Sequence, residues 1–148
     1  MATFQYSFQK IVDLKNSEKM QAEWLLSSAL NTLTEEEQSL QQLHIVKREW
    51  EERLHRASQN AIPLSELQLI GQYLDYLDSC IANKQKDVQQ AERHVSQQRD
   101  FLTDRMKDEK IWMKAKDHAL SRFRQAMQLK EQNELDELAT ARFMVSTP

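Results

Sequence analysis

Few side chains of this chain are placed to bind a metal ion or to act as nucleophiles. The histidines follow neither the H-x-x-x-H nor the H-E-x-x-H spacing of helical metal sites; they are His44, His55, His94 and His118. Cys80 is the single cysteine, so neither a cysteine-based zinc site nor an intrachain disulfide is expected. His44 and His55 could share one helix face, as ordinary surface histidines also do. The pattern predicts no bound metal.

The carboxylates and the glycine content give no better support for catalysis. Paired carboxylates act as acid and base only where a concave pocket shifts their pKa values. A single glycine in 148 residues excludes the glycine-rich loops that bind phosphate groups. We therefore predict that the protein is not an enzyme and that it needs no cofactor.

The composition indicates long helices. With one glycine and two prolines the chain can form few turns, which disfavours sandwiches, barrels and α/β folds. A net charge of −3 and a mean hydropathy of −0.75 favour neither nucleic-acid binding nor insertion into a membrane. The first residues do not resemble a secretory signal. We expect an all-α, cytoplasmic protein, with an RNA-binding hairpin as a distant alternative.

The chain divides at one place, the segment 57–63, which ends at Pro63. We expect a helix over about 7–57, a turn over about 58–64 and a helix over about 65–142, forming one antiparallel coiled-coil hairpin. Ser65 and Gln68 have the spacing of a capping box at the start of the second helix. Leu64 and Leu69 have the spacing of the accompanying hydrophobic staple.

Apolar residues spaced by three and four predict the seam between the two helices. In the second helix the pattern runs from Leu67 to Leu102 and continues through Met106 and Met113. This requires two successive steps of four, from Gln98 to Leu102 and from Leu102 to Met106, which indicates a stutter. In the first helix three charged residues fall at seam positions and should weaken the packing there: Lys15, Glu18 and Glu36.

The two predicted helices differ in length, about 75 Å against about 115 Å at 1.5 Å per residue. Phe8 should then lie opposite about residue 114, and the second helix from about Ala115 onward should have no packing partner within its own chain. Apolar residues nevertheless continue at helical spacing in this overhang, at Leu120, Phe123, Met127, Leu135 and Leu138. An unpartnered apolar stripe predicts that the end holding both termini inserts into a partner.

Charge is unevenly distributed along the second helix. Seven basic residues lie between Arg105 and Arg124, and the acidic residues Glu131, Glu134, Asp136 and Glu137 follow. These blocks are either solvated helix faces or electrostatic contacts with a partner, and the sequence leaves both interpretations open.

A second candidate surface lies near the turn. Tyr73, Leu77, Cys80 and Lys84 fall on one helical face, and the first helix places Leu43, Val46 and Trp50 close to the same turn. Periodicity alone favours a structural role for these residues, as part of the seam between the two helices or beside it.

Three segments resemble the FliJ-type proteins of the bacterial flagellar type III export apparatus. The first is the aromatic opening from Phe4 to Lys15, which includes Phe8 and Ile11. The second is the pattern Leu40-x-x-Leu43-x-x-Val46-x-x-x-Trp50-x-x-x-Leu54. The third is the segment from Gln72 to Ile81 after the turn. The size, the single turn and the longer second helix are also similar to this family.

The resemblance implies a stalk-like coiled coil similar to the central stalk of rotary ATPases. The end with both termini would enter the hexameric export ATPase and promote its assembly, through Phe4, Phe8, Ile11, Leu120, Phe123, Met127, Leu135 and Leu138. Further partners would be the ATPase regulator and the export chaperones that the protein escorts. The protein would be cytoplasmic, at the inner face of the cell membrane below the flagellum.

The resemblance also assigns the surface near the turn to the cytoplasmic domain of the export gate membrane protein. The residues carried over are Tyr73, Leu77, Cys80, Lys84, Leu43, Val46 and Trp50. Cys80 and Lys84 depart from the alanine and histidine of well-studied relatives, so their roles are the least supported. A generic coiled-coil scaffold, or the equivalent stalk of a virulence-type secretion system, remains an alternative.

Overall fold

The part of the chain that the structure describes forms two long helices, as the sequence predicts. The computed structural model describes residues 2–146, in which helix α1 spans Gln9–Gln59 and helix α2 spans Leu64–Ser146. α2 is the longer, with 83 residues against 51. Both helices end within four residues of the predicted bounds. Within the described residues no helix has the length and apolar character that a membrane-spanning segment requires.

α2 begins at Leu64, two residues earlier than a capping box with Ser65 at the N-cap requires. The carbonyl oxygen of Pro63 accepts the backbone N–H groups of Glu66 (3.1 Å) and Leu67 (3.4 Å), so it starts the helical hydrogen bonding. Ser65 therefore lies inside the first turn, where its hydroxyl cannot cap the helix. Leu64 and Leu69 are 69% and 64% exposed, so the predicted hydrophobic staple is wrong as well.

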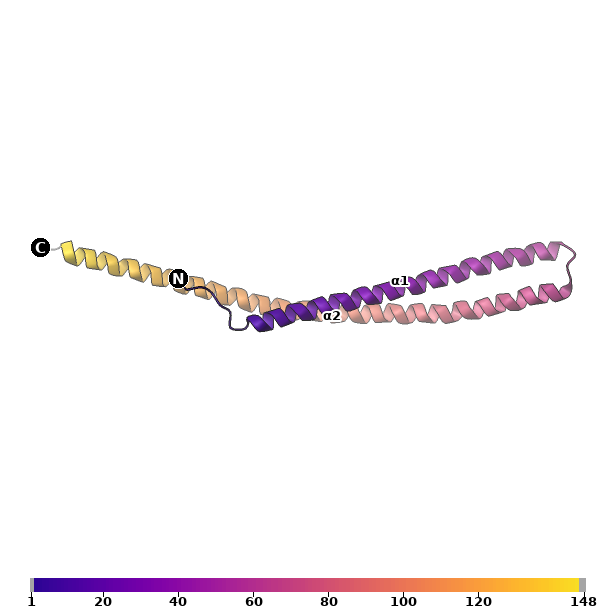
Figure 1. Ribbon diagram of the computed structural model, residues 1–148, viewed down its shortest axis with the longest axis horizontal. Coiled ribbons are helices and arrows are strands. Elements are labelled where there is room, and N and C mark those ends of the chain that lie inside the picture. The colour runs from indigo at the N-terminus through magenta and orange to yellow at the C-terminus, as the bar shows by residue number, and fades with distance from the viewer. Residues whose placement is uncertain (1, 147–148) are drawn as a thin grey trace. The chain divides into compact units, whose positions relative to one another are not determined.

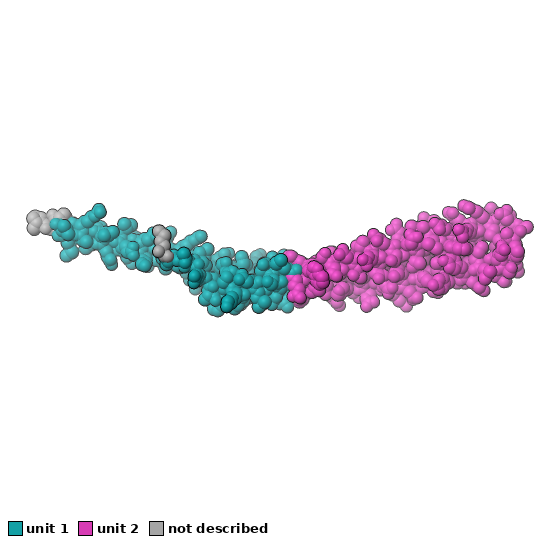
Figure 2. All heavy atoms as spheres, viewed as in Figure 1, with its two compact units in different colours: residues 1–20, 104–148 teal, residues 21–103 magenta. Residues whose placement is uncertain are grey.

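The chain forms two compact units (Figure 2). Unit 1 consists of residues 1–20 and 104–148, and thus contains both chain ends. Unit 2 consists of residues 21–103 and contains the turn. In unit 2, α1 and α2 run antiparallel and side by side from the turn (Figure 1).

The core of unit 2 is a thin line of small and branched side chains along the seam. Its buried members are Ala22, Ala29, Leu77, Ile81, Val88, Ala91 and Val95. The small alanine side chains occupy little space between the helices, and the larger branched residues of α2 supply most of the buried apolar surface. Every seam residue predicted between Leu67 and Leu102 is buried or half-buried, which confirms the three-and-four spacing in this stretch.

A charged pair also belongs to the interface of unit 2. Lys84 of α2 donates a hydrogen bond to Glu36 of α1 at 3.0 Å, and both side chains are 28% exposed. The expectation that Glu36 weakens the seam omitted this partner. Because opposite charges at a seam pair only in one alignment, Glu36 and Lys84 help to fix the register of the two helices.

In unit 1 the seam follows charged residues that the apolar pattern missed. The predicted seam residues Met106 and Met113 are 51% and 41% exposed, so this prediction is wrong. Arg105, Glu109 and Trp112 are half-buried instead and continue the spacing of three and four from Leu102. No stutter is needed here, because the long charged side chains occupy the seam positions.

The predicted start of the overhang is also wrong. Residues 2–8 precede α1 and extend along α2, so that the ring of Phe4 contacts that of Phe123 at 5.4 Å between centroids. Phe8 contacts Trp112 at 6.1 Å, close to the predicted position opposite residue 114. The prediction counted only helical residues as partners, whereas this N-terminal arm covers α2 well beyond Ala115.

Candidate partner-binding surfaces

Unit 1 carries an aromatic cluster that joins the N-terminal arm, here residues 2–8, to α2. The ring centroids of Phe4 and Tyr6 are 6.5 Å apart, and those of Tyr6 and Phe8 are 5.7 Å apart. Phe123 and Trp112 complete the cluster from α2 through the contacts with Phe4 and Phe8. Such ring pairs add about 0.5–1.5 kcal/mol each beyond the buried area. The cluster therefore holds the arm against α2.

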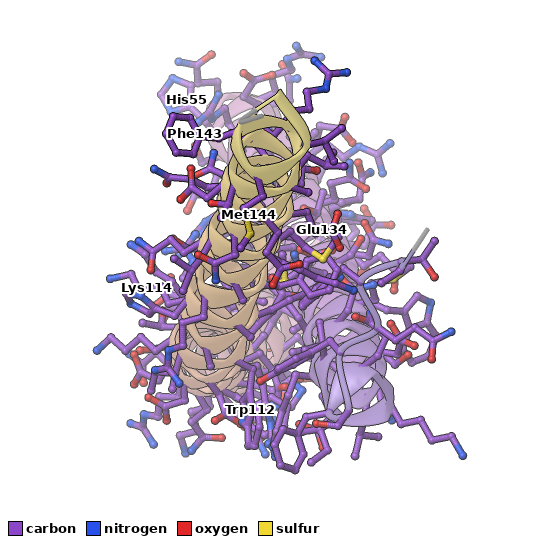
Figure 3. The ribbon with its side chains drawn as sticks, turned by 90° about the vertical axis from the view of Figure 1, so that its left-hand side faces the viewer. His55, Trp112, Lys114, Glu134, Phe143 and Met144 are labelled. Carbon is purple, nitrogen blue, oxygen red and sulfur yellow. The ribbon has the colours of Figure 1, made fainter. Side chains whose placement is uncertain are left out.

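Figure 3 looks onto α2 of unit 1 with the C-terminal end of the helix toward the viewer. Trp112 and Lys114 leave α2 on different sides. Trp112 is half-buried, whereas Lys114 is exposed. The basic block in this part of α2 is divided in the same way, because Arg105 and Lys116 are half-buried whereas Lys114 is exposed.

The packed side of unit 1 contains a network of ion pairs between the two helices. Lys15 contacts Asp108 at 2.8 Å, and Glu18 accepts a hydrogen bond from Arg105 at 3.1 Å. The hydrogen bond from Lys15 to Asp108 raises the pKa of the Lys15 ammonium above its usual 10.5. Arg105, the member of the basic block in this network, therefore binds within the helix interface. It is neither on a solvated helix face nor in contact with a partner, the two interpretations that the sequence left open.

A third interhelical pair in unit 1 leaves one carboxylate oxygen buried and without a hydrogen bond. Lys19 donates to Oε1 of Glu109 at 3.1 Å. Oε2 of Glu109 is buried and has no hydrogen-bond partner in the structure. Glu109 thus resembles Glu18 and Glu36 in facing a cation of the other helix.

The sequence-predicted residues of the terminal surface fall into two groups. Those that pack in unit 1 are Phe4, Phe8, Ile11, Leu120, Phe123 and Met127, all half-buried except Phe8, which is 50% exposed. Leu135 and Leu138 are 65% and 59% exposed. The N-terminal arm therefore covers part of the predicted ATPase-binding surface, and the rest of that surface is exposed to solvent.

The open part is the C-terminal end of α2, here called the solitary helix, residues 128–145. Every one of these residues is exposed. At 1.5 Å per residue the segment is about 27 Å long, and it includes the exposed apolar side chains of Leu129, Leu135, Leu138 and Val145. Most of the stability of a helix in a protein comes from packing of its apolar face, so packing against another surface would stabilise this segment.

The predicted surface near the turn lies in unit 2 and is only partly accessible. Leu77 is 3% exposed and belongs to the seam, so its side chain is closed to any partner in this structure. Leu43, Val46, Trp50, Cys80 and Lys84 are half-buried, and Tyr73 is 37% exposed. The structure thus brings all seven residues to one part of unit 2, with Tyr73 the most exposed of them.

Aromatic stacking organises this surface near the turn. Trp50 of α1 meets Tyr73 of α2 edge to face at 4.8 Å, and Tyr73 lies 6.1 Å from Tyr76. The guanidinium of Arg53 lies over the Trp50 ring at 4.5 Å. The sequence prediction omitted Arg53 and Tyr76. Their spacing of three residues from Trp50 and Tyr73 was the signal that could have identified them.

Polar contacts fix the less exposed members of the same surface. A hydrogen bond with Cys80 raises the pKa of the Tyr76 hydroxyl above its usual 10.0. The hydrogen bond to Glu36 raises the pKa of Lys84, against the opposing effect of burial. Lys84 is therefore engaged within the hairpin through Glu36 and also lies 3.7 Å from Asp87.

Neither surface has the geometry of a metal site. In the described part of the chain, no three histidine, cysteine or acidic side chains are placed to hold a metal ion together. What both surfaces offer instead are aromatic rings, apolar side chains and charges arranged along helices, which are features of protein–protein contacts.

The comparisons with known proteins decide the family. The family model described as "Flagellar FliJ protein" matches residues 4–147. The chain belongs to the FliJ family. The flagellar FliJ protein of Bacillus subtilis (strain 168) is 25% identical over 145 residues, which cover 96% of this chain and 97% of the relative. No solved structure matches the chain.

Family membership confirms the resemblance found in the sequence and covers both candidate surfaces. The match extends from Phe4 of the N-terminal arm to residue 147, beyond the solitary helix. FliJ proteins are a flagellar family by name, and membership implies a component related to flagellar export. The binding role of each surface residue stays a prediction.

Proposed function

We propose that this FliJ protein is a stalk-like, non-enzymatic component of the flagellar export apparatus. Its terminal surface in unit 1 binds the hexameric export ATPase and promotes assembly of the ring. Its surface near the turn in unit 2 binds the cytoplasmic domain of the export gate. The protein also escorts export chaperones, contacts the ATPase regulator and acts in the cytoplasm at the inner face of the membrane.

The solitary helix is the observation that carries this proposal. Residues 128–145 are all exposed, so a partner that covers the apolar side chains of this helix would remove them from water, which supports the proposal. A ring that surrounds the helix would cover all of its sides at once, which a flat surface could not do. By the resemblance to the central stalks of rotary ATPases, the hexameric export ATPase would be such a ring.

The aromatic group near the turn supports the contact with the export gate. Trp50, Tyr73 and Tyr76 form a connected set of rings on the surface of unit 2. Tryptophan and tyrosine are the side chains that most often dominate the energy of a protein interface. Leu77 supports this group from the seam, where it is buried, and Tyr73 is the residue that we expect to contact the gate.

Binding measurements with the two purified partners test the proposal. The full chain should bind both the export ATPase and the cytoplasmic domain of the gate. Tyr73→Ala should weaken binding to the gate and reduce swimming, while binding to the ATPase stays unchanged. A matched control is Tyr76→Phe, which keeps the ring and removes only the hydroxyl. If Tyr73→Ala cells swim normally and the variant binds the gate at full strength, the gate surface is wrongly assigned.

The same measurements separate the two alternatives. A generic scaffold would associate with itself and bind neither partner. A stalk of a virulence-type secretion system would bind the ATPase of that system in preference to the flagellar one. Either result would overturn the proposed flagellar role.

A further inference from the structure

The seam positions of α2 continue into the solitary helix and become acidic there. From Met127 the spacing of four and three passes through Glu131, Glu134, Leu138 and Ala141. The face that packs against α1 and the arm in the earlier part of α2 therefore presents two glutamates flanked by leucine in the solitary helix. Figure 3 shows the Glu134 side chain projecting from α2.

Elsewhere in the chain, carboxylates at or beside the seam pair with a cation of the opposite helix. Glu18 meets Arg105, Glu36 meets Lys84 and Glu109 meets Lys19, each at 3.0–3.1 Å. None of the ion pairs among the described residues includes Glu131 or Glu134. These two glutamates occupy the same register without such a cation.

We propose that the solitary helix docks into an apolar protein surface that carries a lysine or arginine side chain opposite Glu131 and Glu134. Leu135 and Leu138 would pack against its apolar part, and the cation would bind the two carboxylates as Arg105 binds Glu18. The inference rests on the proposed function, which makes this surface part of the ATPase ring, and it adds the chemistry by which the ring recognises the helix.

A second copy of this chain is a poorer occupant of the same face. The solitary helix carries Glu131, Glu134, Asp136 and Glu137 against only Lys130 and Arg142. In a pair of such helices, the acidic blocks would lie against each other across the interface and repel. A cationic surface instead turns the same charges into attractive contacts.

Two variants of equal charge test the proposal against the purified flagellar export ATPase, with the full chain throughout. Glu131→Gln with Glu134→Gln neutralises the seam carboxylates, and Asp136→Asn with Glu137→Gln neutralises two that lie outside the seam register. All four residues are exposed, so the helix should be retained, which circular dichroism checks. We expect the dissociation constant to rise about tenfold for the seam variant and less than about twofold for the control.

Three outcomes would overturn the inference. Equal losses in both variants would mean that only the overall charge matters, and an unchanged affinity of the seam variant would mean that no cation faces Glu131 and Glu134. Stronger self-association of the seam variant, with no ATPase binding by the natural chain, would identify a second copy as the occupant. A chain ending at Gln128 that keeps full affinity for the ATPase would contradict the proposed insertion itself, and the inference with it.

Discussion

The ring of Phe4, which precedes α1, lies 5.4 Å from that of Phe123, far along α2. This contact shows that the chain before the first helix takes part in the helical pairing. The N-terminal arm covers a part of α2 that has no partner in α1. Phe4 and Phe123 are both among the residues expected to bind the ATPase, so the arm occupies part of that surface in the free protein.

Removing the Phe123 ring should release the arm. Phe123→Ala removes the contact with Phe4, which is worth about 1 kcal/mol beyond the buried area. We expect chymotrypsin to cleave severalfold faster within residues 2–8, as followed by mass spectrometry. Met127→Ala is the control, because Met127 is half-buried but belongs to no ring contact. Equal cleavage of the natural chain and the Phe123 variant would show that the ring does not hold the arm.

The charged pair in the seam of unit 2 should contribute measurably to stability. Glu36→Gln removes the carboxylate nearest to the half-buried Lys84 ammonium and leaves only Asp87 at 3.7 Å, so the thermal midpoint should fall by a few degrees. Adding Lys84→Met to this variant should recover part of the loss, since no uncompensated charge then remains. Glu52→Gln is the control, because Glu52 forms an exposed pair with Arg56. Additive losses in the double variant would contradict a direct interaction.

Stability should decline at alkaline pH because three interhelical lysines have raised pKa values. Hydrogen bonds to Asp108, Asp78 and Glu36 raise the pKa of Lys15, Lys47 and Lys84 above 10.5 in the folded protein. A raised lysine pKa contributes stability that is complete below the unfolded value of 10.5 and is lost as the pH rises through the folded value. Urea unfolding at pH 8, 10 and 11.5 should show this loss above about 10.5. A midpoint that stays constant across this range would contradict the assignment.

Leu77 and Leu69 differ in burial on the same helix and should differ in energetic weight. Leu77→Ala removes a side chain that is 3% exposed and leaves a cavity in the seam, which should lower the free energy of unfolding by about 2–3 kcal/mol. Leu69→Ala, at a position that is 64% exposed, should change it by less than about 0.5 kcal/mol. Urea unfolding measures both. Similar small effects would show that Leu77 is not part of the core.

The sequence predicts the hairpin well where apolar side chains form most of the seam. From Leu67 to Leu102 the spacing of three and four identifies the residues that face α1, because burial of apolar surface determines the packing there. The single break before Pro63 also gives the turn. Both predictions depend on local spacing and composition, which a single sequence displays directly.

The same reasoning fails where polar residues take the seam positions. The apolar pattern selects Met106 and Met113, whereas Arg105 and Glu109 pack in the seam and are stabilised by Glu18 and Lys19 of the other helix. Such pairs depend on partners about 90 residues away, which no local pattern reveals. The contact of Phe4 with Phe123 was missed for the same reason.

The candidate surfaces could be located from the sequence, but their accessibility could not. Tyr73 and Leu77 share a helical face in the sequence, yet Tyr73 is 37% exposed and Leu77 is 3% exposed. Which side chain reaches a partner is set by the rotation of α2 against α1. That rotation depends on seam contacts such as the one between Lys84 and Glu36.

The most direct test of the central claim compares the full chain with a chain ending at Gln128 in their effect on the flagellar export ATPase. Gel filtration and the rate of ATP hydrolysis are measured with each. The proposed function predicts that the full chain raises the rate and shifts the ATPase to a ring-sized complex, whereas the shortened chain stays helical and does neither. Equal stimulation and equal ring assembly by both chains would contradict insertion of the solitary helix into the ring.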